Sequence, residues 1–309
     1  MAKIAWSSPL DNSSNTGFRA WGSELSNNFS AVGLVNHTAD TGQINWATAN
    51  VPASSGVYAG YEIWKFNDSL QSTSPIYMKV EYGTYGYSAT SPSLRISVSN
   101  GWANNGNLLT STVNTAPYML SSSAPPSSTT QSYISYMTYN NGFFGLSWKS
   151  NYYSASTGNW FLICRTSDQT TQAYTAIGAA IYSAKYDYYS SYNTPIYSWM
   201  TYSPSASNAV FSTIQSWSGC LVPGAPPSTS TPYNISNKTF PHWIAAPTAL
   251  SQLIGMCAVN ANEMPAGTTF TTTLFGSTPR TYLVLPKIGS SGFSEASSNA
   301  NYTIAMLWE

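Results

Sequence analysis

Few residues of this chain could do chemistry, and their spacing matches no catalytic or metal-binding pattern. The two histidines, His37 and His242, lie far apart, whereas metal sites are built from clustered His, Cys or carboxylate ligands. His37 and Asp40 come closest to a polar pair, and a capped turn explains them. The segment Gly145–Lys149 approaches the G-x-S-x-G nucleophile motif but ends in Lys. We therefore expect no metal, no cofactor and no activated serine.

Acid–base chemistry would have to come from scattered carboxylates. A glycosidase needs two of them roughly 5–10 Å apart. Spacing in sequence does not decide which acids meet in space, but scattered acids are what any soluble surface carries. We therefore expect no enzymatic activity, and a polysaccharide depolymerase is the least favoured alternative. The candidate acids are Glu62, Asp68, Glu81, Asp168, Asp187 and Glu263.

The composition favours contact with other surfaces over catalysis. Charged residues make up 7% of the 309 residues, and 11 Lys and Arg balance 11 Asp and Glu. Without a basic stripe, binding to nucleic acid through counterion release is not expected. A net charge near zero also gives little protection against self-association. We therefore expect the chain to work inside an assembly, in contact with other copies of itself.

The sequence also bears on where the protein is made. The segment Met1–Trp6 lacks the apolar stretch of a signal peptide. No run approaches the ~18 apolar residues of a membrane span. We expect synthesis in a cytoplasm without membrane insertion. The three cysteines, Cys164, Cys220 and Cys257, form no CxxC pair and are interpreted as small core residues.

One amphipathic helix is predicted near the start of the chain. Asn15 or Thr16 can cap it and Gly33 can end it, while Gly22 in its interior costs roughly 1 kcal/mol relative to Ala. The helix must therefore dock through its apolar stripe, either on its own domain or on a neighbouring subunit. The stripe consists of Phe18, Trp21, Leu25, Phe29 and Val32.

Most of the chain after residue 56 has the period of two that is typical of half-buried strands. The alternation is clear at 76–82 and at 94–99. We expect a mainly β protein, an antiparallel β-sandwich or jelly-roll-like architecture with one short N-terminal helix. Residues 1–56 would form an N-terminal arm with the helix, and 57–309 an antiparallel β domain. The Pro-rich stretch 222–232 is the candidate point of subdivision.

A three-stranded antiparallel meander is predicted in the middle of the chain. Its first two strands, 133–139 and 143–148, flank the turn Asn140-Asn141-Gly142, and its third strand covers 159–165. An Asn-Gly pair favours the positive φ values of a type I′ turn. Near the C-terminus, a hairpin around Gly276-Ser277 and a last strand from Tyr302 are expected, and 247–259 is ambiguous between strand and helix.

An excess of aromatic residues is the positive signal. Aromatic residues make up 15% of the chain, and tyrosines crowd between Tyr174 and Tyr202. Tyrosine is favoured at interfaces because it offers a large, stiff, amphipathic surface. Three interpretations stay open for this tract: ordinary strand and loop residues, a subunit interface, or a glycan-binding surface. With the helix stripe, the candidate interface residues are Phe18, Trp21, Leu25, Phe29, Tyr182, Tyr186, Tyr188, Tyr189, Tyr192, Tyr197 and Trp199.

Several short segments resemble stretches in a known class of proteins. These are Leu34-Val35 with 38–45 (Thr-Ala-Asp-Thr-Gly-Gln-Ile-Asn), then 60–68 (Gly-Tyr-Glu-Ile-Trp-Lys-Phe-Asn-Asp), and 80–83 (Val-Glu-Tyr-Gly). They resemble accessory virion structural proteins of tailed bacteriophages, of the tail, fibre-attachment or capsid-decoration type. The likeness covers the first third of the chain and contains no catalytic signature.

The resemblance implies a virion component that is made in the host cytoplasm. Its partners would be other copies of itself and other virion proteins, met through protein–protein contacts. The alternative is a carbohydrate-binding adhesin of the virion that recognises a glycan on the host surface.

Overall fold

The computed structural model describes eighteen stretches of the chain. The two Pro-rich stretches, 124–127 and 222–232, lie outside them, as does Cys220. The described residues are 2–10, 14–54, 56–84, 92–103, 105–108, 113–114, 118–119, 131–150, 159–168, 171, 173–184, 196–202, 209–213, 239–246, 249–260, 264–273, 278–286 and 302–309.

The described chain is mainly β, with antiparallel sheets and one helix, α1 (Asn15–Val32). A six-stranded sheet contains β2 (Val35–Asn36), β3 (Tyr58–Lys65), β4 (Tyr77–Thr84), β5 (Pro92–Ser99), β8 (Val113–Asn114) and β9 (Tyr118–Met119). A two-stranded sheet pairs β6 (Trp102–Ala103) with β7 (Asn107–Leu108). A twelve-stranded sheet contains β1 (Ala2–Leu10), β10 (Gln131–Asn140), β11 (Phe143–Ser150), β12 (Asn159–Ser167), β13 (Tyr174–Ala184), β14 (Ile196–Tyr202), β15 (Ala209–Thr213), β16 (Thr239–Ala246), β17 (Ala249–Asn260), β18 (Thr269–Thr272), β19 (Arg280–Val284) and β20 (Tyr302–Leu307).

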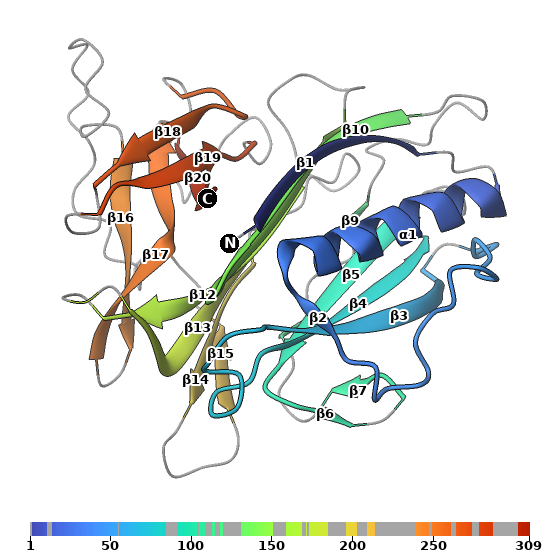
Figure 1. The fold of residues 1–309 in the computed structure, drawn as a ribbon, viewed down its shortest axis with the longest axis horizontal. Helices are drawn as coiled ribbons and strands as arrows, with labels where there is room; N and C mark the ends of the chain where they lie inside the picture. The colour runs from blue at the N-terminus through green and yellow to red at the C-terminus, as the bar shows by residue number, and fades with distance from the viewer. Residues whose placement is uncertain are drawn as a thin grey trace.

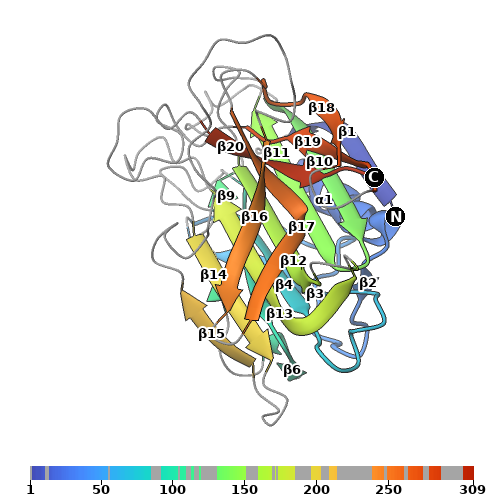
Figure 2. The same cartoon turned by 90° about the vertical axis from the view of Figure 1, so that its left-hand side faces the viewer.

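The strands are arranged in three layers. The middle layer, here called the central strands, consists of β1 and β10–β13 of the large sheet. The N-terminal layer, α1 with β2–β5, lies on one side of the central strands, and the C-terminal layer, β17–β20, lies on the other (Figure 1; Figure 2 gives the view from the side). This arrangement confirms the expected sandwich-like antiparallel architecture with a single helix.

Strand β12, in the middle of the central strands, is buried on both faces, which explains its sequence. In β12, Phe161 and Ile163 face the first hydrophobic core, which they share with the N-terminal layer. Trp160, Leu162 and Cys164 face the second core, which they share with the C-terminal layer. All nine residues of β12 are buried. A strand covered on both sides has a continuous apolar run in place of an alternating pattern.

Helix α1 lies where the sequence places it, but its cap differs. Ser14, rather than Asn15 or Thr16, is the N-cap: its Oγ accepts a hydrogen bond from the Gly17 backbone N–H at 3.0 Å. The Asn15 side chain instead accepts a bond from the Val51 N–H at 2.9 Å. Gly33 ends the helix with a φ of 107°, the left-handed conformation that favours glycine.

The predicted meander is present as β10–β11–β12, with Asn140 paired to Phe143 at the first turn. The turn itself differs from the expected type I′ turn, which needs two positive φ values. Asn141 has a φ of 38°, but Gly142 has no positive φ. The Gly142 N–H instead bonds to the Asn140 carbonyl at 2.5 Å, the i→i+2 pattern of a γ-turn.

Two other segments complete the large sheet. The ambiguous stretch 247–259 contains most of strand β17, and the expected hairpin strands pair as β18 with β19, although the turn Gly276-Ser277 lies outside the described residues. The expected last strand is β20, which pairs with β17 and β19. Strand β1 was not predicted. The segment expected as an arm contributes nine residues that pair continuously with β10. The N-terminal stretch is therefore part of the large sheet.

Candidate functional site

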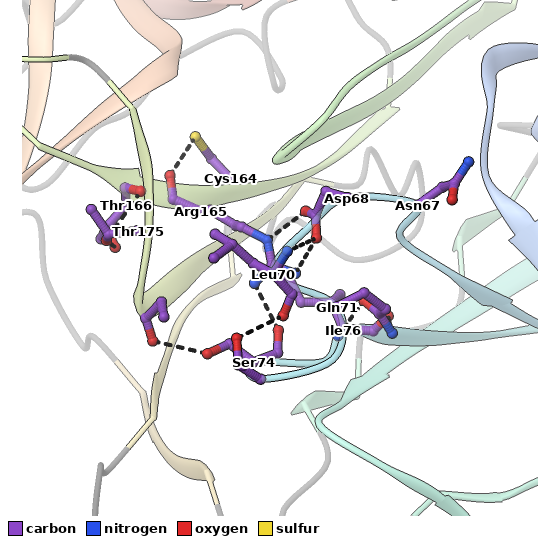
Figure 3. A network of polar contacts seen from close by, with 12 residues as sticks. Asn67, Asp68, Leu70, Gln71, Ser74, Ile76, Cys164, Arg165, Thr166 and Thr175 are labelled. Carbon is purple, nitrogen blue, oxygen red and sulfur yellow. Dashed lines mark hydrogen bonds and ion pairs between the residues drawn. The ribbon is translucent and has the colours of Figure 1, made fainter.

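One buried polar site joins two sheets. Asp68, in the loop between β3 and β4, pairs with Arg165 of β12, a residue 97 positions away. Arg165 donates through Nε to Asp68 Oδ2 at 2.7 Å and through Nη2 to Oδ1 at 3.1 Å (Figure 3). The Arg165 side chain is 0% exposed and that of Asp68 is 3% exposed. Paired, planar hydrogen bonds of this kind are the strongest that a guanidinium makes with a carboxylate.

The loop carrying Asp68 is also held to the central strands by Ser74. Arg165 Nη1 donates to the Ser74 carbonyl at 2.8 Å, and Ser74 Oγ donates to the Ala176 carbonyl at 3.1 Å (Figure 3). The guanidinium also lies 5.6 Å from the Phe66 ring centroid. Arg165 thus meets a carboxylate, a carbonyl and an aromatic face. This inter-sheet contact fixes the N-terminal layer on the central strands.

A second buried carboxylate, Glu62 of β3, holds α1 on the six-stranded sheet. It has four neutral donors around it. Ser26 of α1 donates at 2.7 Å and Tyr82 of β4 at 2.5 Å, and the indole nitrogens of Trp46 and Trp64 donate at 3.1 and 3.2 Å. Glu62 therefore anchors the helix without a cation. Burial and the adjacent Glu62 charge raise the pKa of Tyr82 well above its usual value.

The residues around Glu62 also explain why a glycine, Gly22, stands inside α1. A Cβ atom at this position would overlap the Trp46 ring, so only glycine lets the ring lie against the helix. Trp46 is then placed edge-on to Tyr82, with ring centroids 4.7 Å apart, and donates to Glu62. The helix-propensity cost of a glycine here, roughly 1 kcal/mol, is offset by this close approach.

Asp40 forms a third polar site, on the outer side of the six-stranded sheet. Its carboxylate accepts bonds from Tyr61 Oη at 2.9 Å, Trp102 Nε1 at 2.8 Å and the backbone N–H groups of Gly42 and Gly106 at 2.9 and 2.7 Å. Burial alone would raise the pKa of Asp40, but these four donors lower it below its ordinary value. The pKa of Tyr61 is raised to about 12 by burial and its bond to Asp40. Asp40 therefore holds the β6–β7 turn against β3.

Beside Asp40, the outer face of β3–β5 carries charged residues in a row. Glu81 bonds to Lys79 at 3.2 Å and to Arg95 at 2.5 Å. Lys79 lies 4.9 Å from the Tyr61 ring centroid, and Arg95 lies 4.4 Å from that of Tyr58. The pKa of Glu81 is lowered because its two cationic partners outweigh the effect of burial. Each of these two half-buried rings therefore has a cation over one of its faces.

The acids that the sequence offered for catalysis are thus occupied. Glu62, Asp68 and Glu81 hold layers or strands together, and Asp168 accepts bonds from the Thr171 N–H and hydroxyl at 2.7 and 3.0 Å. Asp187 and Glu263 lie outside the described residues. Within the described part of the chain, no three His, Cys, Asp or Glu side chains gather as metal ligands.

The predicted helix stripe lies in the chain's own core. Phe18, Trp21, Leu25 and Phe29 are at most 9% exposed and pack against β3–β5 and the central strands. This is the first of the two alternatives considered for the helix. These four side chains are not available to a neighbouring subunit in this structure, so their assignment as interface residues is corrected.

The tyrosine tract is only partly described. Tyr182 is 0% exposed in the second core, which matches an ordinary strand residue rather than an interface residue. Tyr197 and Trp199 lie in β14, opposite Tyr182 and Ala180 of β13. Tyr186, Tyr188, Tyr189 and Tyr192 lie outside the described residues. The interface prediction for these four therefore stays a prediction, as it does for Tyr197 and Trp199, whose side chains lie outside the described part.

The remaining reactive groups are buried or partly buried. Cys164 and Cys257 are free thiols in the second core, as expected of small core residues, and burial raises the pKa of Cys164 to about 12. His37 lies edge-on to Trp102, with ring centroids 4.0 Å apart. Burial and the nearby Lys65 lower its pKa.

α1 is not apolar enough to cross a bilayer, and it is the one helix in the described part.

Comparisons with models of protein families, with curated proteins and with solved structures find no match for this chain. The site therefore has to be interpreted from its own geometry. Sequence reasoning missed the polar contacts of Asp40, Glu62 and Arg165, because most of their partners are distant in sequence. One feature of the sequence could have pointed to these acids. The segments that resemble phage virion proteins contain four of them: Asp40, Glu62, Asp68 and Glu81.

Proposed function

We propose that this protein is a non-enzymatic structural component of a bacteriophage virion, tail- or fibre-associated or capsid-decorating, that acts through protein–protein contacts. The observation that carries the proposal is the use of its acids. Glu62, Asp68, Glu81 and Asp168 each accept bonds from neighbouring side chains or backbone groups. A catalytic pair would instead need carboxylates that face a shared cleft.

The phage part of the proposal is supported by the resemblance of the segments between residues 34 and 83. In the structure these segments form α1's partner strands, β3 and β4, and the loop that carries Asp68. They are scaffold segments, so the resemblance supports a shared architecture for the N-terminal layer. The low charge of the chain supports an environment in which much of its surface is covered.

Quantitative mass spectrometry of purified phage particles tests this proposal. We expect the chain in intact particles at a fixed copy number: hundreds of copies would mean capsid decoration, and six to about eighteen would mean tail or fibre, as the symmetry of closed assemblies suggests. A chain that is abundant in infected cells but absent from purified particles would contradict the proposal.

The alternative, a glycan-binding adhesin, requires aromatic rings with an open face. Where the structure describes the side chain of a Phe, Tyr or Trp, that side chain is buried or half-buried, and Val57 is the one large apolar side chain found exposed among the side chains described. The alternative therefore rests on aromatic residues whose side chains lie outside the described part, which include most of the tyrosine tract. Changing Tyr188 and Tyr189 together to Ser separates the cases: particles that keep the protein but adsorb poorly to cells would favour the adhesin.

A further inference from the structure

The chain contains the tripeptide Asn-Asn-Gly twice, at 104–106 and at 140–142. An asparagine that precedes a glycine can modify itself, because the glycine backbone nitrogen can attack the side-chain amide carbon of the asparagine. Glycine permits this close approach because it has no side chain in the way. The asparagines in question are Asn105 and Asn141, and both are exposed. Because the two tripeptides are identical, a difference in their reactivity has to come from the fold.

The backbone conformation of these two asparagines is unusual. Asn105 has a φ of 64° and Asn141 a φ of 38°, and they are the two non-glycine residues of the described part with a positive φ. Asparagine visits this region more readily than most residues. The two sites therefore share their sequence, their exposure and the sign of φ. They differ in the group that accepts the hydrogen bond of the glycine nitrogen.

At the β6–β7 turn, the attacking nitrogen is held by a carboxylate. The Gly106 N–H donates to Asp40 Oδ2 at 2.7 Å, and Asp40 is 2% exposed. The nitrogen must lose its proton before it attacks, and a negative charge beside it opposes that loss. The Tyr61 hydroxyl and the Trp102 indole nitrogen also donate to Asp40 and keep its carboxylate in place. The reaction at Asn105 is therefore suppressed.

At the β10–β11 turn, the attacking nitrogen is bound to a neutral group. The Gly142 N–H donates to the Asn140 carbonyl at 2.5 Å. With its positive φ at Asn141, this turn is of the classic γ type, which is rare and strained. The ψ of about −65° in such a turn places the following nitrogen beside the side chain of the central residue. The Gly142 nitrogen thus lies on the side from which it can attack Asn141.

We propose that Asn141 is a site of spontaneous modification and that Asp40 prevents the same reaction at Asn105. Hydroxide from the solvent removes the proton of the Gly142 nitrogen, and this nitrogen bonds to the Asn141 side-chain carbon. The side-chain amide group takes up a proton and leaves as ammonia. Water then opens the resulting cyclic imide at either carbonyl. The products are aspartate and isoaspartate, and no oxidant or reductant is needed.

The modification would change the charge and the length of the turn. Each product adds a negative charge to a chain whose net charge is zero at pH 7. In isoaspartate, the backbone runs through the former side chain, so the turn also becomes longer just before Gly142. The Gly142 carbonyl accepts from the Arg165 N–H at 2.7 Å, so the longer turn adjoins the residue that binds Asp68.

Peptide mapping by mass spectrometry, while the folded chain is kept at mildly alkaline pH, tests the proposal. Aspartate and isoaspartate should form at Asn141 about ten- to hundredfold faster than at Asn105, the range that a hydrogen bond to a charged acceptor supports. In urea, the identical tripeptides should react at similar rates, which makes the unfolded chain the matched control. Equal rates in the folded chain, or a folded Asn141 that stays intact while the unfolded one reacts, would overturn the proposal.

Asp40→Asn tests the protection of Asn105 directly. This variant keeps an acceptor oxygen of the same size but removes the charge, so the reaction at Asn105 should become about tenfold faster or more. The rate at Asn141 should stay unchanged. Trp102→Phe is the second variant, because it loosens the β6–β7 turn and keeps the carboxylate, and Asn105 should stay protected in it.

The two variants separate the charge of Asp40 from the rigidity of the turn. If Trp102→Phe exposes Asn105 to reaction as much as Asp40→Asn does, rigidity protects this residue and the role assigned to Asp40 is wrong. The same conclusion follows if Asp40→Asn leaves the rate at Asn105 unchanged. None of these outcomes bears on whether the chain is found in virions, which particle composition decides.

Discussion

Both outer layers share an apolar core with the central strands, but the N-terminal layer has in addition a buried ion pair to them. In the N-terminal layer, Asp68 pairs with Arg165 of the central strands, and inside the layer Glu62 binds donors from α1 and the sheet. The C-terminal layer is held by an apolar core that contains Leu283 and Met306, in which the Tyr282 hydroxyl donates to a backbone carbonyl. Polar contacts fix position because they tolerate little displacement, whereas an apolar core tolerates repacking.

The largest effect should come from breaking the inter-sheet contact. Arg165→Met leaves the Asp68 carboxylate buried without its cation, and we expect the free energy of unfolding to fall by about 3–5 kcal/mol. Urea unfolding followed by tryptophan fluorescence measures this loss. The double variant Asp68→Leu with Arg165→Met removes both charges and should recover much of the stability. A double variant as unstable as Arg165→Met would show that packing, not the unpaired charge, dominates.

The C-terminal layer should respond to volume rather than to charge. Leu283→Ala removes buried methyl groups from the second core and should lower the free energy of unfolding by about 3 kcal/mol. Leu283→Met keeps the volume and should cost less than about 1.5 kcal/mol. Both are measured by the same urea titration. Equal losses for the two variants would mean that this core is packed as rigidly as the polar contacts on the other face.

Two buried tyrosines allow a direct comparison of the layers. Tyr82 donates to the Glu62 carboxylate at 2.5 Å, and Tyr282 donates to the neutral Ile254 carbonyl at 2.9 Å. Both side chains are 0% exposed. Tyr82→Phe should cost about 1.5–3 kcal/mol and Tyr282→Phe about 0.5–1.5 kcal/mol, because a bond to a charged acceptor contributes more. Equal losses in thermal or urea unfolding would contradict the distinction between the layers.

Gly22→Ala probes the close approach of Trp46 to α1. Alanine is the better helix former by roughly 1 kcal/mol. Its Cβ would nevertheless displace the Trp46 ring, and overpacking of this kind typically costs about 1–3 kcal/mol. We expect a net loss of about 1 kcal/mol by urea unfolding. Asn27→Ala, at an exposed position of the same helix, is the control and should be neutral or slightly stabilising.

The sequence predicted the elements whose signals are local. The apolar stripe from Phe18 to Val32 indicated α1, and the alternation around Met78 and Ile96 indicated β4 and β5. Strand β1 was missed although Ala2, Ile4 and Trp6 alternate with Lys3 and Ala5. A short strand without flanking turn residues carries little signal of its own, and its partner β10 lies far away in sequence.

The polar sites could not be predicted, because each depends on how the layers stack. Asp68 and Arg165 are 97 residues apart, and nothing around either residue indicates the other. The continuous apolar run of β12 was predicted as a strand, but its burial on both faces follows only from the presence of two outer layers. The aromatic residues of α1 were recognised as a docking surface, and the structure shows that they dock on the chain's own sheets.

The smallest effect concerns pH, and it comes from acids of the N-terminal layer. The pKa of Asp40 in the folded chain lies below its ordinary value of 3.8, because its hydrogen bonds outweigh burial. The folded state therefore releases this proton more readily than the unfolded state. The stability contributed by Asp40 is complete above the unfolded pKa and is lost as the pH falls through the folded pKa. Glu81, whose pKa is also lowered, acts in the same direction.

Asp40→Asn should therefore make the free energy of unfolding fall less steeply as the pH is lowered from neutral. Urea unfolding of wild-type and Asp40→Asn chains, from neutral pH down to about pH 3, measures the difference. The two free energies of unfolding should differ most near neutral pH and converge as the pH falls below the unfolded pKa. Thr41→Ala, an uncharged change at the exposed neighbouring position, is the matched control and should leave this pH dependence unchanged. A constant difference at all pH values would show that the asparagine variant fails for steric reasons and that the charge of Asp40 does not hold the β6–β7 turn.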